Sequence, residues 1–119
     1  MSPKEYNRTD RIADMVQREL AQLIQKELRD DRLGLVTLSD VEVTKDLSYS
    51  NVYVTIYPAE QKEESLKTLN RAAGFLRSLL AKRLMLRTVP KLVFHYDDTL
   101  DKSDRINELL NKVLKKDES

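Results

Sequence analysis

Residues 69–84 read L-N-R-A-A-G-F-L-R-S-L-L-A-K-R-L, a helical pattern with a glycine inside it. Apolar residues in and just before this stretch keep steps of three and four straight across Gly74, which indicates one continuous buried face: Leu66, Leu69, Ala73, Leu76, Leu80 and Leu84. A glycine in a helix interior costs about 1 kcal/mol relative to alanine. The pattern therefore predicts two helices, about Lys62–Ala72 and Phe75–Leu86, that meet at a kink at Gly74.

The segment before these helices predicts a helix followed by a β-hairpin. Between Asp10 and Leu28 the apolar residues fall on one stripe, and Asn7 or Thr9 is the expected N-cap. The ranges 36–44 and 49–57 are rich in β-branched and aromatic residues that alternate, as strands do, and 45–48 is the expected turn. The alternation slips in the first strand between residues 38 and 41, which predicts a bulge.

The rest of the chain predicts one more strand and one more helix. Leu92, Phe94 and Tyr96 alternate after Pro90, and an apolar stripe over 103–114 indicates a last helix, with disorder expected at 117–119. The helical connection before the third strand permits a parallel neighbour. We expect one α+β domain over residues 1–119, with a three-stranded mixed sheet and helices packed on one of its faces.

Several classes of protein do not fit this composition. There is no cysteine among the 119 residues, so disulfide frameworks and thiolate metal sites are excluded. No apolar run approaches the roughly 20 residues that cross a bilayer, and the first residues lack the apolar region of a signal peptide. A cytoplasmic location is the expectation.

Charge is distributed very unevenly along the chain, although the formal net charge is only +1. No acid occurs between Glu64 and Asp97, where all seven charged residues are basic: Lys67, Arg71, Arg77, Lys82, Arg83, Arg87 and Lys91. We call these seven residues the basic block. Solvated helices normally mix charges of both signs, so the block favours a polyanionic partner. Arg87 and Lys91 are the members that could instead pair with acids elsewhere.

Gly74 itself has two interpretations. Taken alone, it is best explained as a packing glycine where another element crosses closely. Within the basic block, a kink with free N–H groups and no side chain lets a phosphate backbone approach, which favours nucleic acid.

Other candidate sites have stronger structural explanations. The tyrosines at 49, 53 and 57 could stack bases, but tyrosines commonly cover the open face of a small sheet. His95 could join Ser48 or Ser50 and Asp97 in a triad, but no spacing supports it. Asp97-Asp98 could hold a metal, although a strand-end turn explains the pair better. No Walker loop, G-x-G-x-x-G or H-E-x-x-H occurs, so neither an enzyme nor a cofactor is indicated.

Four segments together resemble the ribosome-binding factor A family over nearly the whole chain. They are the R-T-D-R-I-A-D-M-V-Q-R-E-L helix, the V-T-L-S-D-V-E-V-T-K-D-L-S-Y-S-N-V-Y-V hairpin, the A-A-G-F-L-R-S-L-L-A-K-R-L-M-L-R helix pair and V-P-K-L-V-F-H-Y-D-D-T-L. The resemblance implies a type II KH-like fold in which an Ala-x-Gly kink, here Ala72 to Gly74, replaces the G-x-x-G loop that clamps RNA. Lys91 departs from the acid that is usual in the family.

The resemblance also implies a function. It predicts a non-enzymatic assembly factor that binds the free 30S subunit, helps mature 16S ribosomal RNA and matters most in the cold, as a monomer when free. The basic block and the kink together make the candidate RNA-binding residues: Lys67, Arg71, Ala72, Ala73, Gly74, Arg77, Lys82, Arg83, Arg87 and Lys91. The alternatives are an adaptor that docks an acidic protein through its basic helices, and a small hydrolase that uses His95.

Overall fold

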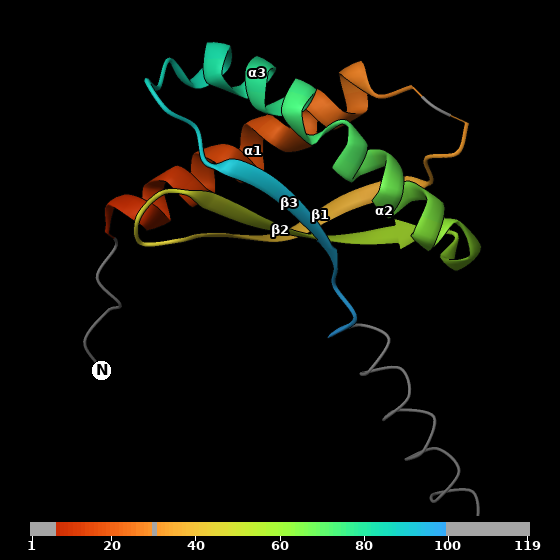
Figure 1. The fold of residues 1–119 in the computed structure, drawn as a ribbon. Helices are drawn as coiled ribbons and strands as arrows, with labels where there is room; N and C mark the ends of the chain where they lie inside the picture. The colour runs from red at the N-terminus through yellow and green to blue at the C-terminus, as the bar shows by residue number, and fades with distance from the viewer. Residues whose placement is uncertain (1–6, 30, 100–119) are drawn as a thin grey trace, which may run out of the picture.

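The computed structural model describes residues 7–29 and 31–99, and its elements follow in the predicted order (Figure 1). They are α1 (Arg8–Glu27), β1 (Leu35–Val43), β2 (Tyr49–Tyr57), the short 3-10 helix η1 (Ala59–Gln61), α2 (Lys62–Arg71), α3 (Ala73–Leu84) and β3 (Lys91–Tyr96). This α–β–β–α–α–β order is the one expected for a type II KH-like fold. The predicted helix at 103–114 and the tail at 117–119 lie outside the described residues.

The sheet has the order β1-β2-β3, a detail that the sequence left open. β1 pairs antiparallel with β2, and β2 pairs parallel with β3, so the predicted mixed sheet is confirmed. The register of β1 against β2 shifts between Leu38 and Asp40, which confirms the predicted bulge. The bulge restores the alternation that places Val41 and Val43 on the buried side.

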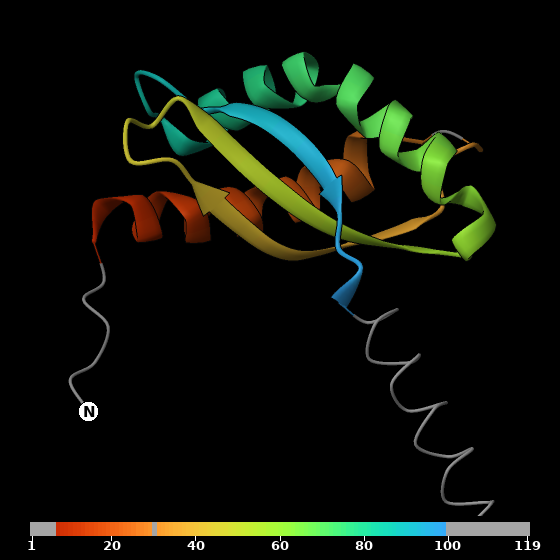
Figure 2. The same cartoon turned by 60° about the horizontal axis from the view of Figure 1, so that its bottom comes forward.

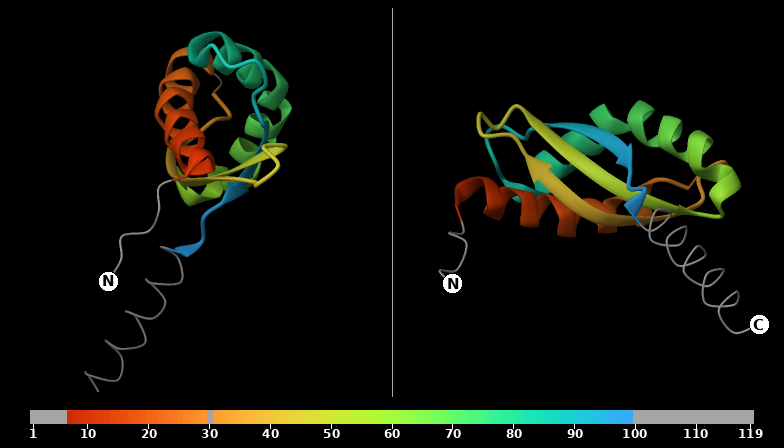
Figure 3. Two further views of the ribbon diagram at one scale, coloured as in Figure 1. Left: turned by 90° about the vertical axis from the view of Figure 1, so that its left-hand side faces the viewer. Right: turned by 90° about the horizontal axis from the view of Figure 1, so that it is seen from below.

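The three described α-helices cover the same face of the sheet and leave its other face uncovered by any of them (Figures 2 and 3). Val52, Val54 and Ile56 of β2 form the floor of the core, as their alternation predicted. The α1 stripe packs on them from one side, and Leu69, Leu76 and Leu80 of α2 and α3 close the core. None of the described helices is long and apolar enough to cross a membrane.

Helix α1 begins with a capping box. The Asn7 Oδ1 accepts a hydrogen bond from the Asp10 N–H at 3.0 Å, and Asp10 Oδ2 accepts one from the Asn7 N–H at 3.1 Å. Two of the first-turn backbone donors are thereby satisfied. Asn7 is thus the cap, and Thr9 supports it by donating its hydroxyl to Asn7 Oδ1 at 2.6 Å.

Two polar contacts attach α2 to its neighbours. Asn70 bonds to the outer edge of β3, where its Oδ1 accepts from the Phe94 N–H at 2.9 Å and its Nδ2 donates to the Phe94 carbonyl at 3.2 Å. Ser65 Oγ accepts from the Gly34 N–H at 2.8 Å, at the entry to β1. These contacts fix the direction of α2 and therefore the position of its C-terminal end.

Candidate nucleic-acid interface

The break between α2 and α3 lies at Ala72, two residues before the predicted position. Ala72 has φ −84° and ψ −1°, and its N–H still bonds to the Thr68 carbonyl at 3.0 Å. The hydrogen bonds of α3 start with the Leu76 N–H donating to the Ala72 carbonyl at 2.9 Å. Gly74 therefore lies inside the first turn of α3, and the predicted kink at Gly74 is wrong in position although the break itself is real.

The packing interpretation of Gly74 is also wrong. A Cβ built on Gly74 meets no atom within 4 Å, so nothing crosses closely at this point. The packing glycine of the chain is Gly34, where a Cβ would lie 2.7 Å from the Tyr57 carbonyl oxygen. Gly74 instead leaves a piece of helix surface open to solvent.

The first turn of α3 is exposed at Gly74, and it holds the backbone N–H groups at the start of the helix. Its N-cap, Ala72, has no side chain that could accept a hydrogen bond from them. The first N–H groups of a helix have no partner within the helix, and the helix dipole adds positive potential there. An anion such as a phosphate is therefore favoured beside Ala73 and Gly74.

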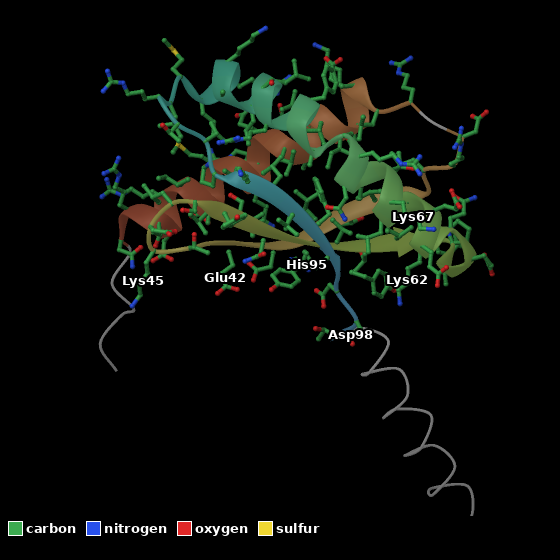
Figure 4. The ribbon with its side chains drawn as sticks, viewed as in Figure 1. Glu42, Lys45, Lys62, Lys67, His95 and Asp98 are labelled. Atoms are coloured by element: carbon green, nitrogen blue, oxygen red, sulfur yellow. The ribbon has the colours of Figure 1, made fainter. Side chains whose placement is uncertain are left out.

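The side chains of the basic block fall into two groups. Five are exposed and form no ion pair with a described carboxylate: Lys67, Arg71, Lys82, Arg87 and Lys91. Figure 4 shows one of them, Lys67, on α2. The other two have partners within the molecule: Arg77 Nε donates to the Val89 carbonyl at 2.8 Å, and Arg83 Nη1 lies 3.1 Å from Glu19 Oε2 of α1.

The structure also separates the block in space and adds cations from outside it. Arg71 and Ala72 line a hollow of about 410 Å³ together with Arg29 and Arg32, which follow α1. Arg77, Arg87 and Lys91 line a second groove together with Arg8. No charge run in the sequence marks Arg8, Arg29 and Arg32, because each lies close to acidic residues in the chain.

The open face of the sheet has the pattern expected from β2, with its tyrosines turned away from the helices. His95 lies on this face (Figure 4), as predicted. Its ring stacks on Tyr53 with centroids 5.3 Å apart, and its Nε2 is 2.9 Å from Asn51 Oδ1. Ser50 is fully buried on the opposite side of β2, so the hypothetical triad with Ser50 is not assembled.

Asp97 closes a turn at the end of β3. It accepts hydrogen bonds from Ser39 Oγ at 2.6 Å and from the Thr99 N–H at 3.0 Å. These bonds, that from Ser39 first, hold the pKa of Asp97 below its ordinary value. Within residues 7–29 and 31–99, no three His, Asp or Glu side chains are grouped so that they could hold a metal ion.

Comparisons with known proteins find relatives of this chain by sequence and by fold. The family model described as ribosome-binding factor A matches residues 8–110. The ribosome-binding factor A of Hahella chejuensis is 48% identical over 98% of this chain and 91% of that relative.

Two structures of relatives have a similar fold. The crystal structure of ribosome-binding factor A from Thermus thermophilus matches with a TM-score of 0.67 and 36% identity, over 76% of this chain and 97% of that one. A homology model of the Thermus thermophilus factor, fitted into the cryo-EM map of a complex with the 30S subunit, matches with a TM-score of 0.63. It is 38% identical over 71% of this chain and 90% of that one.

Proposed function

The chain belongs to the ribosome-binding factor A family, and we propose from this membership that it is a non-enzymatic factor that binds the free 30S ribosomal subunit. Residues 1–119 act as one RNA-binding domain, monomeric when free, in the cytoplasm. The factor assists the late maturation and processing of 16S ribosomal RNA and is most important at low temperature. Misfolded RNA helices rearrange slowly in the cold, and a protein shifts their populations only by its differential affinity for one arrangement.

One observation carries the proposal for this chain: the first turn of α3 is open and lies in a basic setting. Gly74 in this turn is exposed to solvent, and a Cβ built there meets no atom within 4 Å. Lys67 and Arg71 precede this turn, and Lys82 follows it on α3, all exposed. Such a surface suits the phosphate backbone of RNA, which supplies most of the affinity of non-specific contacts.

The test is co-sedimentation with purified 30S subunits. We expect the triple variant Lys67→Glu, Arg71→Glu, Lys82→Glu to lose co-sedimentation and to unfold at the same temperature as the parent. The matched control reverses three exposed cations outside the block, Arg18, Lys26 and Lys45, and it should still bind. Equal binding by both variants would reject the surface.

Crosslinking separates the proposal from the adaptor alternative. Photo-crosslinkers placed at Gly74 and Lys82 should react with 16S ribosomal RNA. Adducts confined to acidic ribosomal proteins would instead favour the adaptor. The role in maturation is tested by depleting the factor and measuring unprocessed 16S ribosomal RNA, which should accumulate more at low growth temperature than at the ordinary one.

A further inference from the structure

A second basic groove lies at the end of the molecule away from α2, where three segments distant in sequence meet. The start of α1, the turn between β1 and β2, and the segment between α3 and β3 come together there (Figures 1 and 3). The groove has a volume of about 660 Å³ and is lined by residues from all three segments. The open turn of α3 at Ala73 and Gly74 does not line it.

The charge in this groove is predominantly positive. Among the residues that the structure describes, its walls carry Arg8, Arg77, Arg87 and Lys91 against a single carboxylate, Asp46. That carboxylate is engaged in closing the hairpin turn, because its Oδ1 accepts from Thr44 Oγ1 at 2.8 Å and from the Ser48 N–H at 3.1 Å. A polyanion that enters the groove therefore meets four cations and one carboxylate, and that carboxylate already accepts hydrogen bonds from Thr44 and Ser48.

Hydrogen bonds between the walls form the groove in advance of any ligand. The Lys91 N–H donates to the Ser48 carbonyl at 2.9 Å and joins β3 to the hairpin turn. The bond from Arg77 Nε to the Val89 carbonyl joins α3 to the segment before β3. Little ordering is then required on binding, which favours affinity.

An exposed aromatic residue distinguishes this groove from a simple anion site. Tyr49 lines the groove, is 46% exposed, and pairs with Lys91 across β2 and β3. Cations beside an exposed aromatic ring are the composition of sites for single-stranded nucleic acid, where the cations hold phosphates and the ring stacks on a base. An acidic peptide would use the cations and leave the ring unexplained.

We infer that this groove binds a single-stranded segment of RNA, with phosphates held by Arg8, Arg87 and Lys91 and one base stacked on Tyr49. The inference rests on the proposed function, since it gives the RNA-binding domain a second contact beside the open turn of α3. Arg77 has its Nε committed to Val89 and acts as a positioning residue for the wall that carries Arg87.

The experiment measures binding of a short labelled oligouridylate by fluorescence anisotropy, and compares it with an abasic ribose-phosphate strand of the same length. Tyr49→Ala should weaken oligouridylate binding about fivefold or more, because a stacked base contributes roughly 1–3 kcal/mol. Tyr49→Phe keeps the ring and should bind like the parent. The abasic strand should bind Tyr49→Ala and the parent equally.

The charge arm uses Arg8→Gln, which lies outside the basic block. It should weaken both strands and reduce the log–log salt slope by about 0.7, the value for one phosphate contact to a single strand. Unchanged oligouridylate binding by Tyr49→Ala and Arg8→Gln would overturn the inference. Polyglutamate binding as tight as oligouridylate binding, and equally weakened by Arg8→Gln, would overturn it as well.

These outcomes are separable from those of the proposed function. If the parent binds oligouridylate through Tyr49 but does not sediment with 30S subunits, the groove is supported and the ribosomal role is contradicted. If the parent sediments with 30S subunits and the Tyr49→Ala and Arg8→Gln variants bind oligouridylate and 30S as the parent does, the ribosomal role stands and the groove is rejected.

Discussion

Gly74 occupies a helical position where alanine would fit, so the fold does not require a glycine there and a functional reason is sought. It lies within α3, no glycine in the described chain has positive φ, and a Cβ there would meet nothing within 4 Å. We expect Gly74→Ala to stabilise the fold by up to about 1 kcal/mol, because alanine loses less backbone freedom in a helix. Urea denaturation measures this gain.

The same substitution should reduce affinity for 30S subunits, since a methyl group would stand where a phosphate backbone approaches. The matched control is Gly34→Ala, where the new Cβ would lie 2.7 Å from the Tyr57 carbonyl oxygen. That variant should lose stability by about 1–3 kcal/mol through overpacking. A Gly74→Ala protein that is more stable and binds normally would show that the open helix surface is not used.

Met85 has a backbone conformation that is unfavourable for a residue with a Cβ. It ends α3 in the left-handed region, with φ 53° and ψ 31°, and its side chain is 90% exposed. The left-handed conformation costs a residue with a Cβ about 1–2 kcal/mol. Glycine avoids this cost, but it loses more conformational entropy on folding, which offsets part of the gain. We expect Met85→Gly to raise the free energy of unfolding by about 0.5–1 kcal/mol, measured in urea.

The control for this prediction is Met85→Ala. It removes the exposed thioether but keeps the Cβ, so the backbone strain stays and stability should not rise. A gain in Met85→Ala equal to that in Met85→Gly would mean that the side chain, and not the left-handed backbone, is responsible.

At the scale of the elements, Asn70 joins α2 to the edge of β3 by imitating a neighbouring strand. Its amide both accepts from and donates to the backbone of Phe94. Asn70→Leu should destabilise the fold by about 2 kcal/mol, because two hydrogen bonds of about 1 kcal/mol each are lost. Amide hydrogen exchange at Phe94 should accelerate in the same variant.

Lys67→Leu is the comparison for Asn70→Leu, since it places the same apolar side chain on the surface of the same helix without touching β3. It should leave both stability and the exchange rate at Phe94 nearly unchanged. Slow exchange at Phe94 in Asn70→Leu would show that the edge of β3 is protected by the packing of α2 alone.

Elements with a strong local pattern were predictable from the sequence. The stripe of α1 and the alternation of β2 each follow from one period, and the phase slip after Leu38 marked the bulge correctly. The break between the helices was predicted at the residue that most weakens a helix, Gly74, but it lies at Ala72. Its position depends on where Asn70 and Leu69 attach α2 to the sheet, and those contacts are long-range.

At the scale of the whole molecule, the sequence shows how charges are distributed along the chain. It does not show which charged side chains lie next to one another in the folded protein. The basic block contains no acid, yet Glu19 of α1 reaches Arg83 of α3, 64 residues away. Arg8 at the start of α1 and Arg29 just after its end each share a groove with members of the basic block. The packing of α1 against α3 thus gives Arg83 an ion-pair partner, while Lys82 has none among the described carboxylates.

Lys82 and Arg83 test this view of the electrostatic field, because they are adjacent cations with different surroundings. Lys82 forms no ion pair with a described carboxylate, whereas Arg83 Nη1 contacts Glu19 Oε2 and Gln22 Oε1, both at 3.1 Å. Lys82→Gln should weaken 30S binding and lower the log–log salt slope by about 0.7–0.9, as expected for one lost phosphate contact.

Arg83→Gln should change the slope clearly less, and Glu19→Gln should strengthen binding by releasing Arg83. Equal losses for Lys82→Gln and Arg83→Gln, with no gain for Glu19→Gln, would mean that the ion pair does not screen Arg83 from the RNA.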